Sequence, residues 1–346
     1  MIDVGILGAT GMVGQQFIAS LKGHPWFRVA WLGASERSAG KPYREACAWR
    51  LPTPLPREVA DRIVESAVPD HAPGLVFSGL DSSIAGEVEA AFAKAGRTIV
   101  SNSRNYRMEP TVPLLIPEVN ADHLALLSAQ GEACGWPGRI ITNPNCAAVV
   151  LAMALAPLRQ FGLQKVLITT LQAISGAGYP GVASWDILGN VVPHIGGGEE
   201  EKIETETKKM LGSLAGRAVQ EHAVTISATT TRVPVQNGHT GSIAVALDQQ
   251  PDPAAIVDAW RSFRGEPQRF ELPSAPPAPL VYLEEPNRPQ PALDATRDGG
   301  MTVTLGRLRR CPVLGYKFVG LGHNTIRGAA GAAILNAELM HRKGML

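Results

Sequence analysis

Residues 1–14, MIDVGILGATGMVG, contain the clearest structural signal in the N-terminal part of the chain. Val4–Leu7 is an apolar run that predicts a buried strand, and Met12–Leu21 predicts a helix after it. Glycines at such a strand-to-helix turn let backbone N–H groups at the start of the helix approach a pyrophosphate. The spacing GxxGxxG differs from the common GxGxxG, and a turn without a ligand is the alternative. The strand before it and the helix after it favour a dinucleotide-binding turn.

The residues that follow alternate between strand-like and helix-like segments. Ile84–Ala95 predicts a helix, and four short apolar runs predict strands: Val29–Leu32, Leu75–Ser78, Thr98–Val100 and Ile140–Thr142. This alternation is typical of a parallel sheet covered by helices on both faces. We therefore expect an α/β fold that begins with a Rossmann-like dinucleotide-binding domain.

The end of the second strand bears on the choice between NAD and NADP. An NAD site usually places an acid there to hold the ribose 2′-hydroxyl. Here Gly33-Ala34 ends the strand, and Ser35, Arg37 and Ser38 follow. Hydroxyls and an arginine suit a 2′-phosphate, which favours NADP, whereas Glu36 would favour NAD if it held the ribose.

The pattern of apolar segments changes after residue 145 and predicts a second, α+β domain with a more antiparallel sheet. A long apolar helix, Cys146–Leu158, precedes three strand-like segments separated by Gly-rich loops: Lys165–Leu171, His222–Val233 and Ser242–Ala246. Eight prolines within Pro267–Pro291 exclude continuous regular structure, so we expect surface excursions there. Thr325–His341 has helical apolar spacing and small residues suited to packing on the first domain. The expected domains are residues 1–145 plus 324–346, and 146–323.

Composition excludes several classes of protein. Hydrophobic residues make up 45% and charged residues 18% of the chain, which excludes a disordered protein. Lys+Arg 32 against Asp+Glu 31 leaves a net charge of +1 with scattered basic residues, which argues against a nucleic-acid partner. The run Cys146–Leu158 is shorter than the roughly 20 residues of a membrane span, and no signal region precedes the first strand. Four cysteines without a CxxC pair fit a reduced protein. We expect a cytoplasmic protein that does not bind membranes.

Cys146 has a distinctive position in the sequence. The segment Ile140-Ile-Thr-Asn-Pro-Asn-Cys146 runs from a strand into a helix, and Asn145 is a good N-cap residue. A thiol in the first turn of a helix feels the positive end of the helix dipole, which stabilises the thiolate. We therefore predict that Cys146 is a nucleophile, and that Cys47, Cys134 and Cys311 are small hydrophobic residues.

Motifs spread along the chain resemble those of the aspartate-semialdehyde dehydrogenases of archaea, fungi and some bacteria. They are GATGMVG, ASERSAGKPY, VPLLIPEVN, NPNC, QAISGAGYPG, GEEEKIETET, RVPVQNGH and GLGHNTIRGAAGAAILNAEL. The resemblance implies a second domain of the glyceraldehyde-3-phosphate-dehydrogenase-like type, used for catalysis and dimerisation. It also implies NADP-dependent reductive dephosphorylation of L-aspartyl 4-phosphate to L-aspartate 4-semialdehyde, reversibly and through a cysteine thioester. This reaction belongs to lysine, threonine and methionine biosynthesis.

The same resemblance implies roles for individual residues. The implied catalytic residues are Cys146, Gln172, which orients the thio-intermediate, and His239, seven residues beyond Arg232. Those implied to bind substrate or phosphate are Arg232, Glu199, Lys202, Arg107 and Asn102, with Arg104 competing for the role of Arg107 and Glu200 and Glu201 for that of Glu199. The implied cofactor contacts are Gly8, Thr10, Gly11, Met12, Val13, Ser35, Arg37, Ser38, Ser82, Ser175, Gly176, Gly178 and Asn324. Asp81 departs from the family pattern, in which a neutral residue stands beside the cofactor.

The chemistry explains why these residue types are needed. His239 can take the thiol proton and return it near neutral pH, and His194 and His323 are the next candidates for a place near the site. Arg232 would hold a carboxylate through two hydrogen bonds, unless it is a surface cation at a strand end. The acids at Glu199–Glu201 also stabilise a helix dipole, which is their alternative role. The histidines and cysteines do not pair at ligand spacing, so we expect no metal site.

Three other functions remain open from the sequence. A malonyl-CoA reductase on the same scaffold would keep Cys146 and His239, but has no substrate ammonium to match with a glutamate. An N-acetyl-glutamyl-phosphate reductase is a more distant possibility. A catalytically silent NADP-binding protein would not need Cys146, Gln172, Arg232 and His239 together. We expect a small-molecule substrate and a homodimer or homotetramer formed through the second domain.

Overall fold

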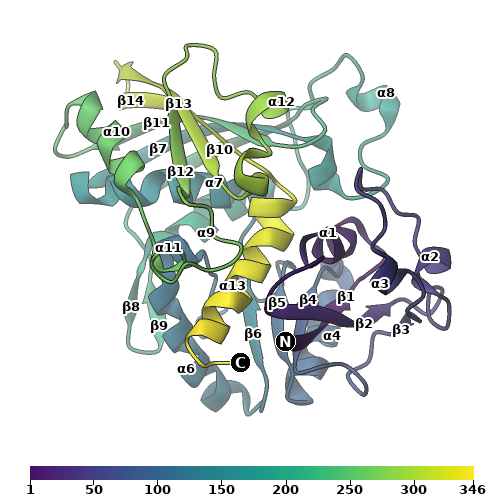
Figure 1. The fold of residues 1–346 in the computed structure, drawn as a ribbon. Helices are drawn as coiled ribbons and strands as arrows, with labels where there is room; N and C mark the ends of the chain where they lie inside the picture. The colour runs from purple at the N-terminus through teal and green to yellow at the C-terminus, as the bar shows by residue number, and fades with distance from the viewer.

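The computed structural model describes all 346 residues. The N-terminal part forms a six-stranded, all-parallel sheet in the order β3-β2-β1-β4-β5-β6 (Figure 1). Its strands are β1 (Ile2–Leu7), β2 (Phe27–Ala34), β3 (Glu65–Ser66), β4 (Leu75–Ser78), β5 (Thr98–Ser101) and β6 (Arg139–Thr142). The order reverses at β1, so the crevice for a ligand opens beyond the carboxyl ends of β1 and β4. The expected Rossmann-like domain is confirmed.

Helices cover both faces of this sheet. Phe17 on α1 and Ile334 on α13 share one buried cluster with Ile6, whereas Phe92 on α4 shares another with Leu7. Neighbouring residues of β1 therefore point to opposite cores, as the uninterrupted apolar run in the sequence requires. The helices and turns of this part are α1 (Met12–Ser20), α2 (Tyr43–Ala46), α3 (Arg57–Ala60), α4 (Ser82–Lys94), α5 (Pro117–Asn120), η1 (Ala121–Ala125) and α6 (Leu126–Cys134).

The second part is built on a six-stranded mixed sheet in the order β10-β7-β11-β14-β13-β12. Its strands are β7 (Leu163–Gln172), β10 (Thr225–Arg232), β11 (His239–Leu247), β12 (Leu280–Leu283), β13 (Val303–Cys311) and β14 (Gly315–Gly322). The pairs β10–β7 and β12–β13 are parallel and the other three pairs are antiparallel. This arrangement confirms the expected α+β domain.

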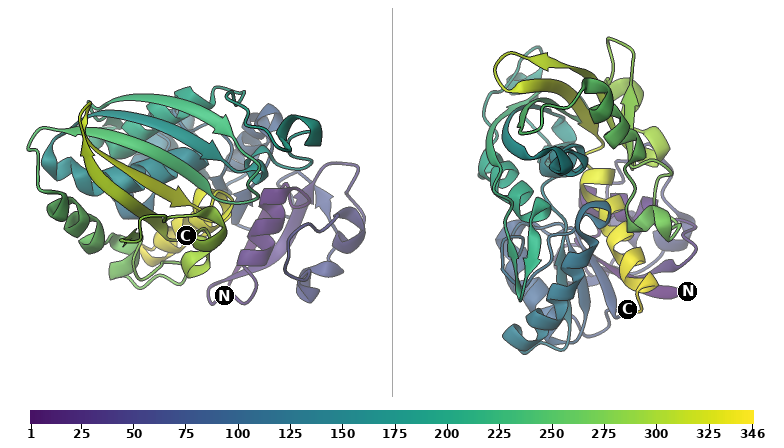
Figure 2. Two further views of the ribbon diagram at one scale, coloured as in Figure 1. Left: turned by 90° about the horizontal axis from the view of Figure 1, so that it is seen from above. Right: turned by 90° about the vertical axis from the view of Figure 1, so that its left-hand side faces the viewer.

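The inner face of the second sheet packs on α7 (Cys146–Leu155), whose nine residues after Cys146 are all buried. The other face carries no helix, and its strands lie open in the left view of Figure 2. Leu167 and Leu171 on that face are 47% and 42% exposed. The remaining elements are η2 (Ala156–Phe161), η3 (Ile174–Ala177), α8 (Ser184–Ile187), α9 (Glu199–Leu211), β8 (Ser213–Ala215), β9 (Ala218–Gln220), α10 (Pro253–Ser262), α11 (Glu266–Arg269), α12 (Pro291–Asp294), η4 (Arg297–Gly300), the π-helical η5 (Ile326–Ala330) and α13 (Gly331–Arg342).

The sequence predicts only surface excursions for the Pro-rich segment, but the segment also contains regular structure. Strand β12 lies inside it and pairs with β13 in the main sheet, and α11 packs against α5 and α13. The prolines stand at the boundaries of these elements: Pro279 directly precedes β12, and Pro267 occupies the first turn of α11. Proline is tolerated at such positions because no backbone N–H is needed there.

The C-terminal segment returns to the N-terminal sheet. Helix α13, yellow in Figure 1, contacts β5 and α1. The predicted single helix over Thr325–His341 instead begins with the π-helical turn η5, after which α13 continues to Arg342. None of the helices in the chain combines the length and apolar character needed to cross a membrane.

Candidate active site

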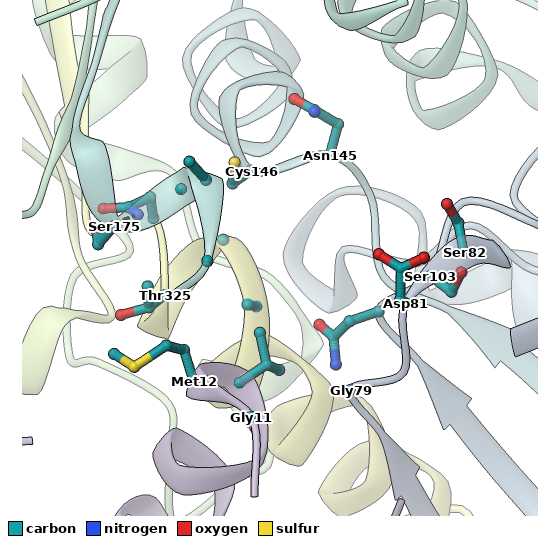
Figure 3. A pocket seen from close by; sticks show the side chains of 18 of the residues that line it. Gly11, Met12, Gly79, Asp81, Ser82, Ser103, Asn145, Cys146, Ser175 and Thr325 are labelled. Carbon is teal, nitrogen blue, oxygen red and sulfur yellow. Dashed lines mark hydrogen bonds between the residues drawn. The ribbon is translucent and has the colours of Figure 1, made fainter. Parts of the chain in front are cut away.

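A cavity of about 780 Å³ is lined by residues from both parts of the chain. Its wall combines the start of α1, the ends of β4 and β5, the starts of α7 and α9, and the turns after β7 and β14. Figure 3 shows the Cys146 sulfur on one side of this space, with Met12 and Gly11 across from it. Asp81 and Ser82 lie on a third side, opposite Ser175 and Thr325.

The glycine turn at residues 8–14 is shaped for a close approach of backbone to a ligand. Gly8 has φ +73°, and a Cβ there would lie 2.8 Å from the Gly79 carbonyl oxygen. A Cβ on Gly14 would lie 2.3 Å from the Gly8 carbonyl oxygen. Helix α1 has Gly11 as its N-cap, with no side chain to accept from its first N–H groups, and residues 10–13 line the cavity. Free N–H donors at a helix start fit the pyrophosphate of a dinucleotide.

Cys146 is the first residue of α7, as its sequence predicts. The Asn145 side chain accepts hydrogen bonds from the N–H groups of Ala147 at 2.9 Å and Ala148 at 3.1 Å, so it caps the helix. Burial nevertheless raises the pKa of the Cys146 thiol to about 12, and the Glu199 carboxylate adds to the rise. The helix start and two arginines act in the opposite direction and are outweighed. The resting thiol is therefore protonated, which corrects the expectation of a thiolate.

Two buried arginines line the cavity near Cys146. Arg232 is 7% exposed and Arg107 is 8% exposed. Arg232 donates from Nη1 to the Ala173 carbonyl oxygen at 2.8 Å, and its burial excludes the alternative of a surface cation. Arg107 donates from Nη1 to Glu206 at 2.9 Å and from Nη2 to the Asn102 carbonyl oxygen at 2.7 Å. Two buried cations on one cavity suit a ligand with two anionic groups.

Glu199 and Lys202, at the start of α9, also line the cavity. Glu199 accepts from Asn145 Nδ2 at 2.8 Å and lies 3.3 Å from Lys202 Nζ. Glu200 accepts instead from the Thr230 N–H, and Glu201 is exposed. Of the three adjacent acids, only Glu199 is part of the cavity wall.

His239 lies behind the turn that follows β7. Its Nδ1 accepts a hydrogen bond from the Ala173 N–H at 3.1 Å, so in the neutral ring Nε2 carries the hydrogen. Nε2 is buried without a partner, 3.1 Å from where a Cβ on Gly176 would lie, and Gly176 lines the cavity. Burial lowers the pKa of His239 to about 3, with a further decrease from Arg232. This arrangement is that of a neutral hydrogen-bond donor, which differs from the expected acceptor of the thiol proton.

Comparison with known proteins identifies the family. The family model described as semialdehyde dehydrogenase, NAD binding domain, matches residues 3–127, and the one described as semialdehyde dehydrogenase, dimerisation domain, matches residues 155–327. The aspartate-semialdehyde dehydrogenase of Methanothermobacter thermautotrophicus is 48% identical over 348 residues, covering 99% of each chain. That of Cryptococcus neoformans is 47% identical over 360 residues, covering 100% of this chain and 98% of the other. The chain belongs to the aspartate-semialdehyde dehydrogenase family.

The fold agrees with solved structures of this family. The structure of the Candida albicans aspartate-semialdehyde dehydrogenase with NADP has a TM-score of 0.92 and 39% sequence identity, and the match covers 100% of both chains. A Vibrio cholerae structure at 23% identity and a TM-score of 0.79 shares the fold. The family resemblance seen in the sequence is confirmed.

The structure of this aspartate-semialdehyde dehydrogenase family member brings many of the expected cofactor residues to one cavity. Those on its wall are Thr10, Gly11, Met12, Val13, Ser82, Ser175, Gly176, Gly178 and Asn324, together with Asn102 from the substrate set. Asn324 links two neighbouring segments, because it donates to Ser175 Oγ at 2.8 Å and accepts from the Gly238 N–H at 2.9 Å. Gly8 lies beneath the turn, and Ser35, Arg37 and Ser38 lie in the turn after β2, outside the wall.

Asp81 has a structural reason to differ from the family pattern. It is the N-cap of α4 and accepts from the Ser83 N–H at 2.9 Å and from Ser83 Oγ at 2.7 Å. These hydrogen bonds lower the pKa of Asp81, so a carboxylate lines this part of the cavity.

The remaining expected residues lie away from the cavity wall. Gln172 is buried, and its Nε2 donates to Thr170 Oγ1 at 3.3 Å. His323 is buried close enough to His239 to lower its pKa, whereas His194 is exposed. No group of three or more His, Cys, Asp or Glu residues is arranged to hold a metal ion.

Three residues at the site had not been singled out from the sequence. Arg50 lines the cavity and donates from Nη2 to the Tyr179 hydroxyl at 3.0 Å, so it links the N-terminal part of the chain to the segment after η3. Gly328 packs directly on Cys146, because a Cβ there would lie 2.6 Å from the Cys146 Cβ. Glu206 contacts Arg107 and the backbone of Asn145. Glu206 lies within GEEEKIETET, a motif that carried the family resemblance, but no local pattern set it apart from the other acids there.

Proposed function

We propose that the chain catalyses the reversible, NADP-dependent conversion of L-aspartyl 4-phosphate to L-aspartate 4-semialdehyde, a step of lysine, threonine and methionine biosynthesis. The observation that carries the proposal is the set of residues that line one cavity. A cysteine at a helix start, two buried arginines and a dinucleotide-binding turn all line it. Relatives that are 46–48% identical over nearly their full length carry this enzyme name.

Each charged group of the substrate has a partner of opposite charge on the cavity wall. Arg232 would hold the α-carboxylate, and Arg107 with Lys202 would hold the phosphate. Glu199 would face the α-ammonium group. A substrate held at both ends would place its acyl carbon at the Cys146 sulfur, which lines the same cavity as both arginines. Such positioning is worth several orders of magnitude in rate.

Acylation follows from this arrangement. Sγ of Cys146 attacks the acyl carbon, the bond from that carbon to the phosphate oxygen breaks, and a thioester forms. The thiol proton leaves with the phosphate, because His239 presents an N–H toward the cavity wall and has no free lone pair. Arg107 and Lys202 stabilise the charge that develops on the leaving phosphate.

Reduction of the thioester needs a hydride donor. The turn at Thr10–Val13 would hold NADPH, which supplies the hydride when bound. Nε2–H of His239 would donate to the oxygen of the former thioester carbonyl as its negative charge develops. When this tetrahedral species collapses, the C–S bond breaks, the aldehyde leaves and the Cys146 thiolate takes up a proton from water. Gln172 would act from behind the cavity wall, since it directly precedes Ala173, whose carbonyl holds Arg232 and whose N–H holds His239.

The preference for NADP over NAD rests on the turn after β2. No acid ends that strand, and Ser35, Arg37 and Ser38 stand in the exposed turn beyond it. We assign the 2′-phosphate of the cofactor to these three side chains. The relative from Candida albicans whose structure contains NADP is consistent with this assignment.

The malonyl-CoA reductase alternative is not favoured. A malonyl thioester has no ammonium group for Glu199 and no transferable phosphate for Arg107, although both side chains face the cavity. The relatives with the aspartate-semialdehyde dehydrogenase name span the whole length of this chain.

The assembly we propose is a homodimer formed through the open face of the second sheet, or a tetramer built from such dimers. The family model that matches this part of the chain is described as a dimerisation domain, and Leu167 and Leu171 are exposed on that face. Leu171→Glu should shift the mass measured by light scattering toward one chain, whereas unchanged mass would place the interface elsewhere. Four unpaired cysteines are consistent with a reducing compartment such as the cytoplasm.

The experiment that tests the proposed function is a phosphate-dependent reductase assay run in the oxidative direction. Purified protein is given aspartate semialdehyde, NADP and inorganic phosphate, and the absorbance of the reduced nicotinamide is followed. We expect turnover that requires all three. Turnover of malonate semialdehyde with CoA would refute the proposal. So would a lack of turnover of aspartate semialdehyde unless CoA is added.

A further inference from the structure

Glu206 links the two halves of the active site. It is on α9, 2% exposed, and each of its carboxylate oxygens has a different partner. Oε1 accepts from Arg107 Nη1 at 2.9 Å, and Oε2 accepts from the Asn145 N–H at 2.6 Å. A single carboxylate thus contacts both the arginine assigned to phosphate and the residue that precedes the nucleophile.

Asn145 transmits this contact to Cys146. Its Oδ1 caps α7, and its Nδ2 donates to Glu199 at 2.8 Å. With the backbone N–H held by Glu206, the side chain and the backbone N–H of Asn145 are both fixed by hydrogen bonds. The position of Asn145 therefore depends on α9, and Cys146 is the next residue along the chain.

The segment that carries Arg107 is also anchored to α9 through its backbone. Lys209, three residues after Glu206, donates from Nζ to the carbonyl oxygens of Arg107, Glu109 and Val112 at 2.7, 2.8 and 3.0 Å. This segment follows β5 of the N-terminal sheet, whereas α9 lies after β7 of the second sheet. Arg107 is therefore fixed relative to the catalytic cysteine by an element outside its own sheet.

We infer that Glu206 is a positioning residue that fixes the phosphate-binding arginine relative to the nucleophile. The inference rests on the proposed function, which assigns phosphate to Arg107. A carboxylate is needed because both of its partners are hydrogen-bond donors. A glutamine in its place offers one oxygen and one NH₂ group, so in either orientation an N–H faces another donor and one link is lost.

The test uses Glu206→Gln with Glu204→Gln as the matched control. Glu204 is on the same helix, and its carboxylate accepts only from the Ala228 N–H, which an amide oxygen can replace. In the oxidative assay we expect Glu206→Gln to raise the KM for inorganic phosphate and to lower kcat/KM for phosphate by on the order of 10²-fold. The KM for NADP should remain near the wild-type value, and Glu204→Gln should resemble the wild type throughout.

A second readout does not depend on turnover. Alkylation by iodoacetamide is followed at the peptide that contains Cys146, because Cys134 is exposed and burial disfavours the Cys146 thiolate. We expect inorganic phosphate bound at Arg107 to slow alkylation at Cys146. Glu206→Gln should need at least about 10-fold more phosphate for half-protection, whereas a purely structural role would lower the melting temperature and leave this concentration unchanged. If Glu206→Gln does not fold, Glu206→Asp keeps the charge with a shorter reach and is measured in the same way.

The outcomes separate this inference from the proposed function. If the wild type shows no phosphate-dependent turnover but the protection still shifts in Glu206→Gln, the proposed reaction fails and the positioning role stands. If the wild type is active and Glu206→Gln matches Glu204→Gln in both measurements, the inference is wrong. The double variant Glu206→Gln, Arg107→Lys should lose less kcat/KM than the two single changes predict together, because both changes disrupt the same Glu206–Arg107 hydrogen bond. Additive losses would also overturn it.

Discussion

Gly328→Ala tests whether the π-helical turn η5 holds the nucleophile in place. The added Cβ would lie 2.6 Å from the Cβ and 3.0 Å from the Cα of Cys146. Ordinary contacts begin at 3.4 Å, so the two segments must separate by about 0.8 Å. Neither atom belongs to the flexible end of a side chain, so the start of α7 or the turn itself must move.

The displacement predicts a larger effect on the reaction than on stability. Overpacking of this size costs about 1–3 kcal/mol of the free energy of unfolding, which a chain of this length can tolerate. A nucleophile misplaced by about 1 Å loses roughly 10²-fold in rate. We therefore expect kcat for aspartate semialdehyde oxidation to fall by on the order of 10²-fold in a folded protein.

The measurement compares kcat, the melting temperature and the rate of Cys146 alkylation in Gly328→Ala and Gly131→Ala. Gly131 lies within α6, outside the cavity wall, with no atom within 4 Å of its added Cβ. Alanine at that position should leave kcat unchanged and add up to about 1 kcal/mol of stability, because alanine favours a helix. A wild-type kcat in Gly328→Ala would show that the position of Cys146 does not depend on η5.

Four further predictions concern the chemistry and the charges of the site. Cys146→Ser should abolish turnover and leave NADPH binding, followed by fluorescence, near the wild-type level; activity near wild type would mean that another group is the nucleophile. Arg37→Ala should raise the KM for NADPH far more than that for NADH, and equal effects would contradict its contact with the 2′-phosphate. Arg232→Lys should lower kcat/KM by on the order of 10²-fold, because one ammonium cannot reproduce the two-pronged hold on a carboxylate; a wild-type value would remove Arg232 from that role. Burial lowers the pKa of His323 from 6.5 to about 4, so the unfolded state takes up a proton first as the pH falls, and by pH 5 this residue alone should cost about 2 kcal/mol of the free energy of unfolding. Urea titrations at pH 7 and pH 5 should show that loss in the wild type and a smaller one in His323→Asn, and equal losses would refute it.

The fold could be predicted where the signal was local. The apolar run Val4–Leu7 and the glycines after it specify strand, turn and helix within 14 residues, and the same alternation recurs up to β6. Strand β12 could not be predicted in this way, because its four residues lie among prolines that mask the pattern of a strand. Its place in the sheet is determined by β13, about 20 residues further along the chain.

The site residues also differ in whether a local or a long-range contact determines them. Cys146 could be found from its own neighbourhood, since a strand, an N-cap residue and an apolar helix adjoin it in the sequence. Glu206 acts on Arg107 across 99 residues, and the Ala173 N–H fixes the His239 ring across 66. The protonation state of Cys146 could not be predicted from the sequence either. The helix start at Cys146 is a local feature, but the burial that raises the pKa of its thiol comes from the tertiary structure.

The neutral resting state of both Cys146 and His239 bears on how the enzyme selects its substrate. A protonated thiol is a poor nucleophile, so attack requires a group that accepts its proton. His239 accepts from Ala173 at its only free lone pair, and Glu199 is held by Asn145 and lies beside Lys202. A phosphate held at Arg107, as we propose, would bring a proton acceptor to the cavity that also contains Cys146. We therefore expect an acyl thioester with the same acyl chain, which lacks that acceptor, to acylate Cys146 more slowly than the acyl phosphate.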